Sequence, residues 1–319
     1  MILVIAEQCA ATLRPVTWET IAAAQQIGGP VKIAVVGVGV SAVAEELSMA
    51  DVDEVIVVEH AALEPYTPDG FVQALSQVIA IEQPELVLLP HTYQVRDYAP
   101  TLATRLERVL VTDCIGSKRR DGNVVLVRPM FQGKFVADVA LDGSAPHFVS
   151  FQSGSYRADV ATRGTVPTGV RTADVMIDTV VIRQHPGTPF KEAKQAVDLT
   201  QADRIVSVGR GIKSRDHLPL VQELASVLDA ELAASRPICD SGWLPMDRQI
   251  GSSGQTVAPK LYVAIGISGA IQHLVGMKGA HTVVAINKDS DAPIFEVADY
   301  GIVGDLFEVV PALLAALED

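Results

Sequence analysis

Several residue classes are scarce in this 319-residue chain. Aromatic residues make up 5% of it, which disfavours the stacked aromatic platform that binds single-stranded nucleic acid. Positive charge is also in deficit, because 25 lysines and arginines face 38 acidic residues, for a formal net charge of −13. Nucleic-acid phosphates require a basic face, so this balance argues against a nucleic-acid partner.

Cysteine is rarer still. The three cysteines, Cys9, Cys114 and Cys239, lie far apart and form no paired motif. They are typical of reduced thiols in a cytoplasmic compartment, or in a mitochondrial matrix if the source is eukaryotic. No Cys-x-x-Cys or His-x-x-x-His pair is present, which argues against a metal site.

Long apolar runs are missing as well. No run reaches the roughly 18 residues that would indicate a membrane-spanning helix, so we expect no membrane insertion. Residues 1–6 are apolar from the start and have no basic segment before them, so they predict a first strand rather than a signal peptide. Apolar residues still make up 49% of the chain, and its length suggests two well-packed domains.

Strand and helix patterns alternate through the first part of the chain. This alternation predicts βαβ units and a parallel sheet. The predicted strands are 2–6, 32–36, 54–58 and 86–89, and the predicted helices are 16–26, 43–49, 71–81 and 98–106.

Between residues 110 and 182 the rhythm changes. Short apolar runs at 123–129, 135–139 and 148–150 are separated by Asp-Gly, Gln-Gly and Asp-Gly dipeptides. Such dipeptides favour tight hairpin turns, so we predict an antiparallel extension of the first sheet.

Residues 183–189, dense in proline and glycine, predict a domain boundary. We therefore expect an N-terminal α/β domain over 1–189 and a second α/β domain over 190–319, each a parallel-sheet sandwich. A helical connector is predicted at 190–197. The second domain is then predicted to have strands at 205–208, 261–265, 282–286 and 301–303, and helices at 219–228, 271–277 and 309–317.

The predicted strands of the second domain end in glycine or polar residues. Open parallel sheets bind ligands at those carboxyl ends. Gly209-Arg210-Gly211 follows one strand, but a lone Gly-x-Gly fits a simple tight turn as well as phosphate or flavin contact. Residues 266–270, Gly-Ile-Ser-Gly-Ala, join a strand to a helix, as a phosphate-binding helix start does. They also resemble a nucleophile elbow, but no acidic residue lies between Ser268 and His281, so a hydrolase triad does not fit.

Four single residues leave alternatives open. His273 is more often satisfied within the protein at such a position than bound to a ligand. Arg236 lies on a connection between strands, where a solvated surface arginine is the simpler interpretation. Asn287 could simply end a strand, and Asp305 could simply cap a helix.

Taken in order, these segments form the pattern of a known family. The chain resembles the alpha subunit of electron transfer flavoprotein, densely over 204–314 and more loosely over 2–182. The segments that carry the resemblance are Gly209-Arg210-Gly211, Ala234-Ser235-Arg236, Gln249-Ile250-Gly251, Val257-Ala258-Pro259, the Gly-Ile-Ser-Gly-Ala-Ile-Gln-His-Leu run at 266–274, Ala285-Ile286-Asn287-Lys288-Asp289 and Ala298-Asp299-Tyr300-Gly301-Ile302-Val303.

The resemblance implies that the second domain is a Rossmann-like domain that binds one FAD, with no catalytic residue and no metal. It places Arg236 over the isoalloxazine, Ser253 near its N5 and His273 near its O2 edge. Relatives often have Gln-Thr where this chain has Ser252-Ser253, so the hydroxyl is kept and the amide is lost. The other implied contacts are Arg210 at the flavin or pyrophosphate, Asn287 and Asp305 at the adenosine end, and Ser235, Gln249, Gly251, Ser252, Gly266, Ser268, Gly269, Ala270 and Gln272 along the path between.

The resemblance also implies a role. The first domain would have a nucleotide-hydrolase-like sheet and would bind a beta subunit, giving a heterodimer. The pair would carry electrons from acyl-CoA or other flavin dehydrogenases to an acceptor such as a quinone oxidoreductase, and would not be an enzyme. A guanidinium and an imidazole beside the flavin would stabilise negative charge that develops there.

Three questions stay open at the level of sequence. The beta subunit could hold AMP, or a second FAD as in electron-bifurcating relatives. The residues alone also fit a self-contained NAD- or FAD-dependent enzyme, or a regulatory nucleotide-binding module.

Overall fold

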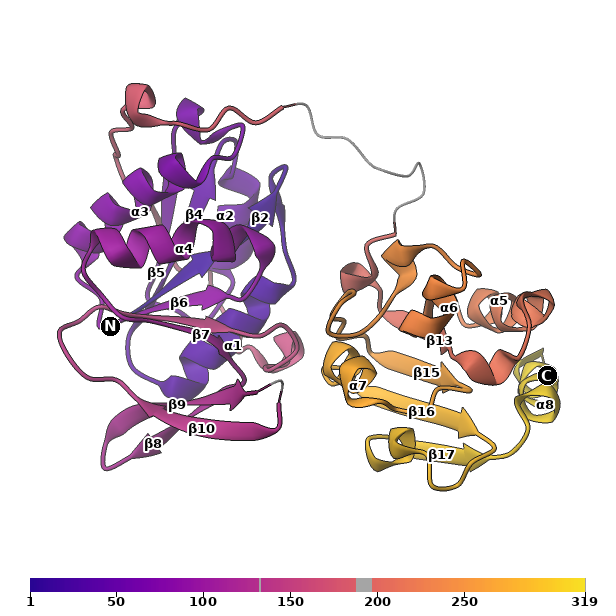
Figure 1. Cartoon of the computed structure of the whole chain (residues 1–319). Helices are drawn as coiled ribbons and strands as arrows, with labels where there is room; N and C mark the ends of the chain where they lie inside the picture. The colour runs from indigo at the N-terminus through magenta and orange to yellow at the C-terminus, as the bar shows by residue number, and fades with distance from the viewer. Residues whose placement is uncertain (132, 188–196, 319) are drawn as a thin grey trace. The chain divides into compact units, whose positions relative to one another are not determined.

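The structure, a computed structural model, describes residues 1–131, 133–187 and 197–318. The chain divides into two compact units, residues 1–189 and 190–319 (Figure 1). The predicted connector helix at 190–197 lies outside the described residues, apart from Val197. None of the described helices is long and apolar enough to cross a membrane.

The first unit is built on a seven-stranded parallel sheet of order β12-β5-β4-β1-β6-β11-β7. The central strands are buried on both faces, as the continuous apolar runs predict for a parallel sheet. The strands are β1 Ile2–Ala6, β4 Val31–Gly37, β5 Glu54–Glu59, β6 Leu86–Pro90, β7 Leu110–Cys114, β11 His147–Phe151 and β12 Gly169–Thr172, with a small hairpin of β2 Gln8–Cys9 and β3 Thr12–Leu13 after β1.

Helices cover both faces of this sheet. Helices α1 (Val16–Ile27) and α2 (Ser41–Ser48) pack on one face, and α3 (Pro68–Glu82) and α4 (Tyr93–Arg105) pack on the other (Figure 1). The last two begin earlier than the apolar pattern predicts. Thr67 and Thr92 cap them, each accepting a backbone hydrogen bond of 3.2 Å, and a cap precedes the first apolar residue.

An antiparallel sheet extends the first unit, as predicted. It consists of β8 (Gly116–Arg120), β9 (Asn123–Met130) and β10 (Phe135–Ala140), in the order β10-β9-β8. The assignment of 148–150 to this extension is wrong, because β11 pairs in parallel with β6 and β7 in the main sheet. Phe148 and Val149 are 0% exposed, a burial on both faces that only the central sheet supplies.

Four charged residues tie the edge strand β12 to the sheet. Lys32 Nζ lies 2.8 Å from Glu82 Oε2 and 3.0 Å from Glu54 Oε2. Arg171 of β12 lies 2.6 Å from Glu82 and 3.0 Å from Glu54. Hydrogen bonds from Arg171 and Lys32 lower the pKa of Glu54. Burial acts to raise the pKa of Glu82, but its bonds to Lys32 and Arg171 outweigh burial and lower it.

This cluster predicts a loss of stability in acid. The unfolded carboxyl pKa is about 4.3, and both folded values are lower, so the unfolded chain binds more protons near that pH. The stabilisation is complete above pH ~5 and is lost as the pH falls through the folded values. Arg171→Ala should cost about 1–2 kcal/mol at pH 7 and flatten the acid decline. Urea unfolding between pH 3 and 7 measures both effects. Arg157→Ala, at an exposed pair with Asp159, is the control and should change neither.

The second unit holds a five-stranded parallel sheet of order β14-β13-β15-β16-β17. Residues of α5, α6 and α8 pack on one face, and residues from the 250–257 segment, α7 and 292–297 pack on the other. The elements are β13 Arg204–Val208, α5 Leu218–Val227, β14 Glu231–Ala234, α6 Arg236–Asp240, β15 Leu261–Ile265, α7 Ile271–Met277, β16 Thr282–Asn287, β17 Tyr300–Val303 and α8 Leu306–Glu318.

Three elements of this unit differ from the prediction: β14 and α6 were not predicted, and α8 begins earlier than predicted. The short strand β14 and the five-residue helix α6 have too few residues for a periodic signal. The last helix begins at Leu306 rather than at residue 309, so Pro311 lies inside it and not in its first turn. Leu306, Val310 and Leu314, spaced four apart, are all buried and extend the apolar face back to the true start.

Candidate functional site

The order of the second sheet reverses between β13 and β15. The carboxyl ends of the strands at such a point form the crevice in which open α/β sheets bind ligands. The turns after β13 and β15 meet there with their backbones in contact. A Cβ atom on Gly211 would lie 2.6 Å from the Cα of Gly266, and Gly266 has a φ of +61°. Glycine is therefore required at both positions by close packing.

Close packing also explains the glycines of the Gly209-Arg210-Gly211 turn. A Cβ on Gly209 would lie 2.4 Å from the Gly266 carbonyl oxygen, so both glycines are explained by contact between the two turns. Arg210 begins a 3-10 turn and is exposed at the carboxyl end of the sheet. Its side chain is open to a ligand, and its contact with flavin or pyrophosphate stays a prediction.

The turn after β15 leaves backbone donors free. Gly269 has a φ of +86°, and a Cβ there would lie 2.2 Å from the backbone nitrogen of Ile294. The amides of residues 269–272 donate no hydrogen bond within the part of the chain that the structure describes. Free amides at a helix start are suited to phosphate oxygens. Ser268, Ala270 and Gln272 are exposed beside them.

The loop at 251–254 rests directly on α7. Ser252 N donates to the Gln272 carbonyl at 2.7 Å, and a Cβ on Gly276 would lie 2.3 Å from the Gly251 nitrogen. Gly251 itself has a φ of +144°. The loop thus presents the exposed Ser252 and Ser253 side chains at a position set by the helix backbone.

Gln249 lies beneath this loop and is 1% exposed. Its Nε2 donates to Ser253 Oγ at 3.0 Å, which orients the serine hydroxyl. Its Oε1 is buried and has no hydrogen-bond partner among the described residues. A buried acceptor without a donor costs about 1–3 kcal/mol, so this oxygen is a candidate acceptor for a ligand N–H or O–H.

His273 is 6% exposed, and both its ring nitrogens have protein partners. Nδ1 lies 3.1 Å from the Ile250 carbonyl, and Nε2 lies 2.8 Å from the Tyr262 hydroxyl. Because a carbonyl only accepts, Nδ1 carries the proton and Tyr262 donates to Nε2. Burial lowers the His273 pKa to about 4, so the ring is neutral near pH 7. An O2 contact would have to replace one of these partners, and it stays a prediction.

Arg236 and Ser235 lie at the end of β14. Ser235 is 8% exposed, and Arg236 begins α6 rather than lying on an open connection. The Arg236 side chain is 66% exposed, and its Nε lies 3.3 Å from Asp240 Oδ2. The guanidinium is thus held by one carboxylate and is otherwise open to a ligand.

Asn287 and Asp305 end the last two strands. Asn287 Nδ2 donates to the Ile267 carbonyl at 2.9 Å, which ties the end of β16 to the turn after β15. Asp305 Oδ1 caps α8 by accepting from Phe307 N at 3.0 Å, and its Oδ2 lies 3.7 Å from Lys213 Nζ. Both residues have the structural roles that the sequence left open, and their contact with adenosine stays a prediction.

The predicted residues therefore come from the turns and loops at the carboxyl side of one sheet. Sequence reasoning missed Tyr262, which fixes the His273 ring, because a tyrosine inside an apolar strand gives no functional signal. It also missed Gln255, whose Oε1 accepts from Leu199 N at 2.9 Å and anchors the 251–254 loop.

By fold and by site, the second unit is a nucleotide-binding α/β domain. Its residues 198–278 match the family model of the electron transfer flavoprotein FAD-binding domain. Residues 2–176 match the electron transfer flavoprotein domain. The chain belongs to the alpha-subunit family of electron transfer flavoproteins, as its sequence pattern indicates, and is an FAD-binding electron carrier subunit.

Individual relatives match over nearly the whole chain. The electron transfer flavoprotein subunit alpha of Bacillus subtilis is 41% identical over 309 residues, covering 94% of this chain and 92% of that protein. The protein of the same name from Thermoanaerobacterium thermosaccharolyticum is 39% identical over 321 residues, covering 99% and 97%. The lactate dehydrogenase (NAD(+),ferredoxin) subunit LctC of Acetobacterium woodii is 34% identical over 312 residues, covering 96% and 74%.

The residues of the second unit fit FAD. The free amides at 269–272 suit a pyrophosphate, the unpaired Gln249 Oε1 suits a polar hydrogen, and the exposed Arg236 suits a ring that gains negative charge. The glycine turns leave the backbone open at the point where the strand order reverses. FAD, when bound, supplies the one- and two-electron chemistry that these side chains lack.

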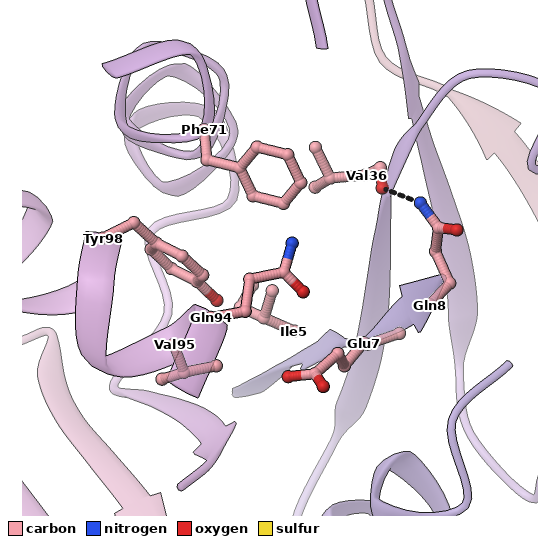
Figure 2. A pocket seen from close by; sticks show the side chains of 9 residues that line it. Ile5, Glu7, Gln8, Val36, Phe71, Gln94, Val95 and Tyr98 are labelled. Carbon is pink, nitrogen blue, oxygen red and sulfur yellow. Dashed lines mark hydrogen bonds between the residues drawn. The ribbon is translucent and has the colours of Figure 1, made fainter. Parts of the chain in front are cut away.

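A cavity in the first unit lies at the corresponding point of the first sheet, the carboxyl end of β1 (Figure 2). Its walls include Ile5, Val36 and Phe71, with Glu7 and Gln94 at its polar side. The volume open to the centre of a water-sized molecule is about 10 Å³, room for about one water. Glu7 is an acidic side chain that accepts a hydrogen bond from Thr92 Oγ1, and an acidic side chain does not suit a phosphate. This cavity is therefore not a second nucleotide site.

The contact between Gly276 and Gly251 predicts a large effect on FAD binding. In Gly276→Ala the new methyl group must push the 251–254 loop away from α7, because the opposing atom is backbone. We expect the affinity for FAD to fall by at least about tenfold, equivalent to 1.4 kcal/mol. Fluorescence titration of the apoprotein with FAD measures it. Lys278→Ala, at an exposed position just after the same helix, is the control and should bind FAD normally. Equal affinity in both variants would contradict the role given to this contact.

Proposed function

We propose that the chain is the alpha subunit of a heterodimeric electron transfer flavoprotein that takes electrons from acyl-CoA or other flavin dehydrogenases and passes them to an acceptor such as a quinone oxidoreductase. The observation that carries the proposal is the convergence of free amides, an unpaired buried acceptor and an exposed arginine at the ligand-binding edge of a FAD-binding domain. A cytoplasmic location belongs to the same proposal, or the mitochondrial matrix in a eukaryote.

In this proposal, different groups of the second unit contact different parts of one FAD. Arg236, Ser253 and His273 contact the isoalloxazine, and the amides at 269–272 with Ser268 contact the pyrophosphate. Asn287 and Asp305 contact the adenosine end, with Arg210 beside the pyrophosphate. The two electrons received from a dehydrogenase must leave one at a time. The protein therefore has to stabilise the negative charge that a single added electron places on the ring. The Arg236 guanidinium supplies positive charge, and a neutral His273 supplies only a dipole.

A beta subunit completes the protein in this proposal, with AMP in its own nucleotide site. The similarity to LctC, which by its name belongs to an enzyme that uses NAD(+) and ferredoxin, favours a second candidate: a subunit of an electron-bifurcating flavoprotein. In that case the beta subunit holds a second FAD. The two candidates differ in nucleotide content and not in the fold of this chain.

One preparation tests these statements. The chain is co-expressed with the beta subunit of the same genome, and the released nucleotides are quantified by chromatography. One FAD and one AMP per heterodimer, with reduction by an acyl-CoA dehydrogenase, support the carrier. Two FAD with NADH-dependent reduction of ferredoxin support the bifurcating subunit. A chain that remains monomeric, holds FAD firmly and accepts electrons without a partner would refute the heterodimer.

A further inference from the structure

The hairpin between β9 and β10 exposes two aromatic rings in contact. Phe131 is 72% exposed and Phe135 is 67% exposed, and their ring centroids lie 6.1 Å apart in an edge-to-face arrangement. Val136, beside them, is 57% exposed. We call Phe131, Phe135 and Val136 the aromatic tip. Tyr93 is the other strongly exposed aromatic among the described residues of this unit, and the Arg96 guanidinium lies 5.6 Å from its ring centroid.

The backbone at the tip is strained. Phe131 has a φ of +53°, a left-handed conformation that costs a residue with a side chain roughly 1–2 kcal/mol. Within this chain the strain is not offset by burial of the ring, which remains 72% exposed. Backbone strain clusters at functional sites, and aromatic residues are enriched at protein interfaces, so this exposed pair is a candidate interface anchor.

The sheet that carries the tip is basic although the chain is acidic. Residues 116–140 contain five basic and two acidic residues, a net charge of +3, against −13 for the whole chain. Arg128, on β9 three residues before Phe131, donates to Thr112 Oγ1 at 3.2 Å but forms no ion pair with a described residue. Its buried Nε also has no partner among the described residues. An arginine in this state pairs well with a carboxylate from outside the chain.

We propose that the aromatic tip, together with Arg128 on the same hairpin, docks the beta subunit, which presents an apolar pocket rimmed by carboxylates. The inference rests on the proposed heterodimer. A permanent partner fits better than a transient one, because a strained and exposed aromatic pair is a liability whenever it is uncovered, and obligate interfaces are the more apolar class. A second copy of this chain fits poorly, since two basic sheets would face each other.

The test is the affinity of the full chain for the beta subunit of the same genome, measured by titration of the separately prepared subunits. Phe131→Ser with Phe135→Ser should weaken binding by at least about 100-fold, as loss of two central aromatic anchors does. Tyr93→Ser, which removes an equally exposed aromatic elsewhere in the unit, should stay within about twofold. Circular dichroism and FAD content check that the double variant is folded.

A charge variant keeps the test valid if the double variant does not fold. Arg128→Gln leaves the tip intact and should lower the association rate and flatten its dependence on salt. Unchanged affinity in the folded double variant, or unchanged salt dependence in Arg128→Gln, overturns the proposal. So does normal beta-subunit affinity combined with slower reduction by a dehydrogenase, which would assign the tip to a transient partner. Self-association of the wild-type chain that the double variant loses would assign it to a second copy. A wild-type chain that binds no beta subunit refutes the heterodimer itself.

Discussion

Replacing Arg236 by alanine is expected to lower the potential at which the bound flavin takes its first electron. The added electron places negative charge on the ring, and in the proposed site the Arg236 guanidinium lies beside the ring and stabilises that charge. At roughly 4 Å and an effective dielectric constant near 20, one unit charge is worth about 4 kcal/mol. For a one-electron couple, a tenfold change in the equilibrium constant corresponds to about 59 mV, or roughly 1.4 kcal/mol. The largest shift in potential that Arg236 could cause is therefore ~170 mV.

The structure reduces this ceiling. The Arg236 side chain is 66% exposed, and Asp240 lies 3.3 Å from its Nε, so solvent and a paired carboxylate both weaken its field. We therefore expect a decrease of some tens of millivolts. The ion pair with Asp240 also predicts a shift in the opposite direction. Asp240→Asn should raise the first-electron potential, because it removes the negative charge that opposes Arg236.

Potentiometric titration of the heterodimer measures these shifts. Arg236→Lys should keep much of the wild-type potential, because the charge remains while any stacking on the ring is lost. Arg204→Ala is the matched control, since Arg204 begins β13 at the opposite edge of the same sheet. An unchanged first potential in Arg236→Ala would remove Arg236 from the flavin site.

The central architecture could be predicted from sequence because parallel strands carry their own signal. Strands β1, β4, β5, β6, β13, β15 and β16 are mainly apolar and largely buried on both faces, and the predicted bounds of each agree with the structure to within one or two residues. The prediction failed where a segment is buried by strands that are distant in the sequence. The local pattern of residues 148–150 is that of a hairpin strand. In the structure they belong to β11, which lies between β6 and β7 in the main sheet and pairs in parallel with both.

For the candidate site, the location could be predicted in part from the sequence, but the state of the side chains could not. Its placement follows in part from the rule that parallel strands end at a shared edge, so Ser268 and Asn287 could be assigned to one side of the second sheet. Arg236 follows strand β14, which was not predicted, and only the family resemblance assigned it to the site. The state of each side chain depends on tertiary partners. The residues alone favoured a His273 satisfied within the protein, and the resemblance placed it at the flavin. Its tautomer is set by Tyr262 and the Ile250 carbonyl and its neutrality by burial, which only the folded chain supplies.

Glu19 is expected to be the main source of pH-dependent stability near neutrality. It lies on α1, and its Oε2 accepts from Gly154 N at 2.7 Å. Burial raises its pKa to about 7 from 4.5, although the Gly154 bond opposes this. Between those two pH values the folded chain binds more protons than the unfolded chain. The stability that Glu19 contributes is therefore complete below about pH 4.5 and is lost as the pH rises through about 7.

Glu19→Gln should remove this dependence, because an amide keeps an acceptor for Gly154 but cannot ionise. A shift of this size corresponds to about 3 kcal/mol, so the variant should be more stable than wild type by about 2–3 kcal/mol at pH 8 and nearly equal to it at pH 4. Denaturant unfolding followed by Trp18 fluorescence in a Trp243→Phe background measures the first unit alone. Glu45→Gln, at an exposed position of α2, is the control. The Arg171 cluster loses stability below about pH 5 and Glu19 loses it above, so wild type should be most stable near pH 5. A Glu19→Gln difference that is the same at pH 4 and pH 8 would show that burial of the ionised carboxylate is not its cause.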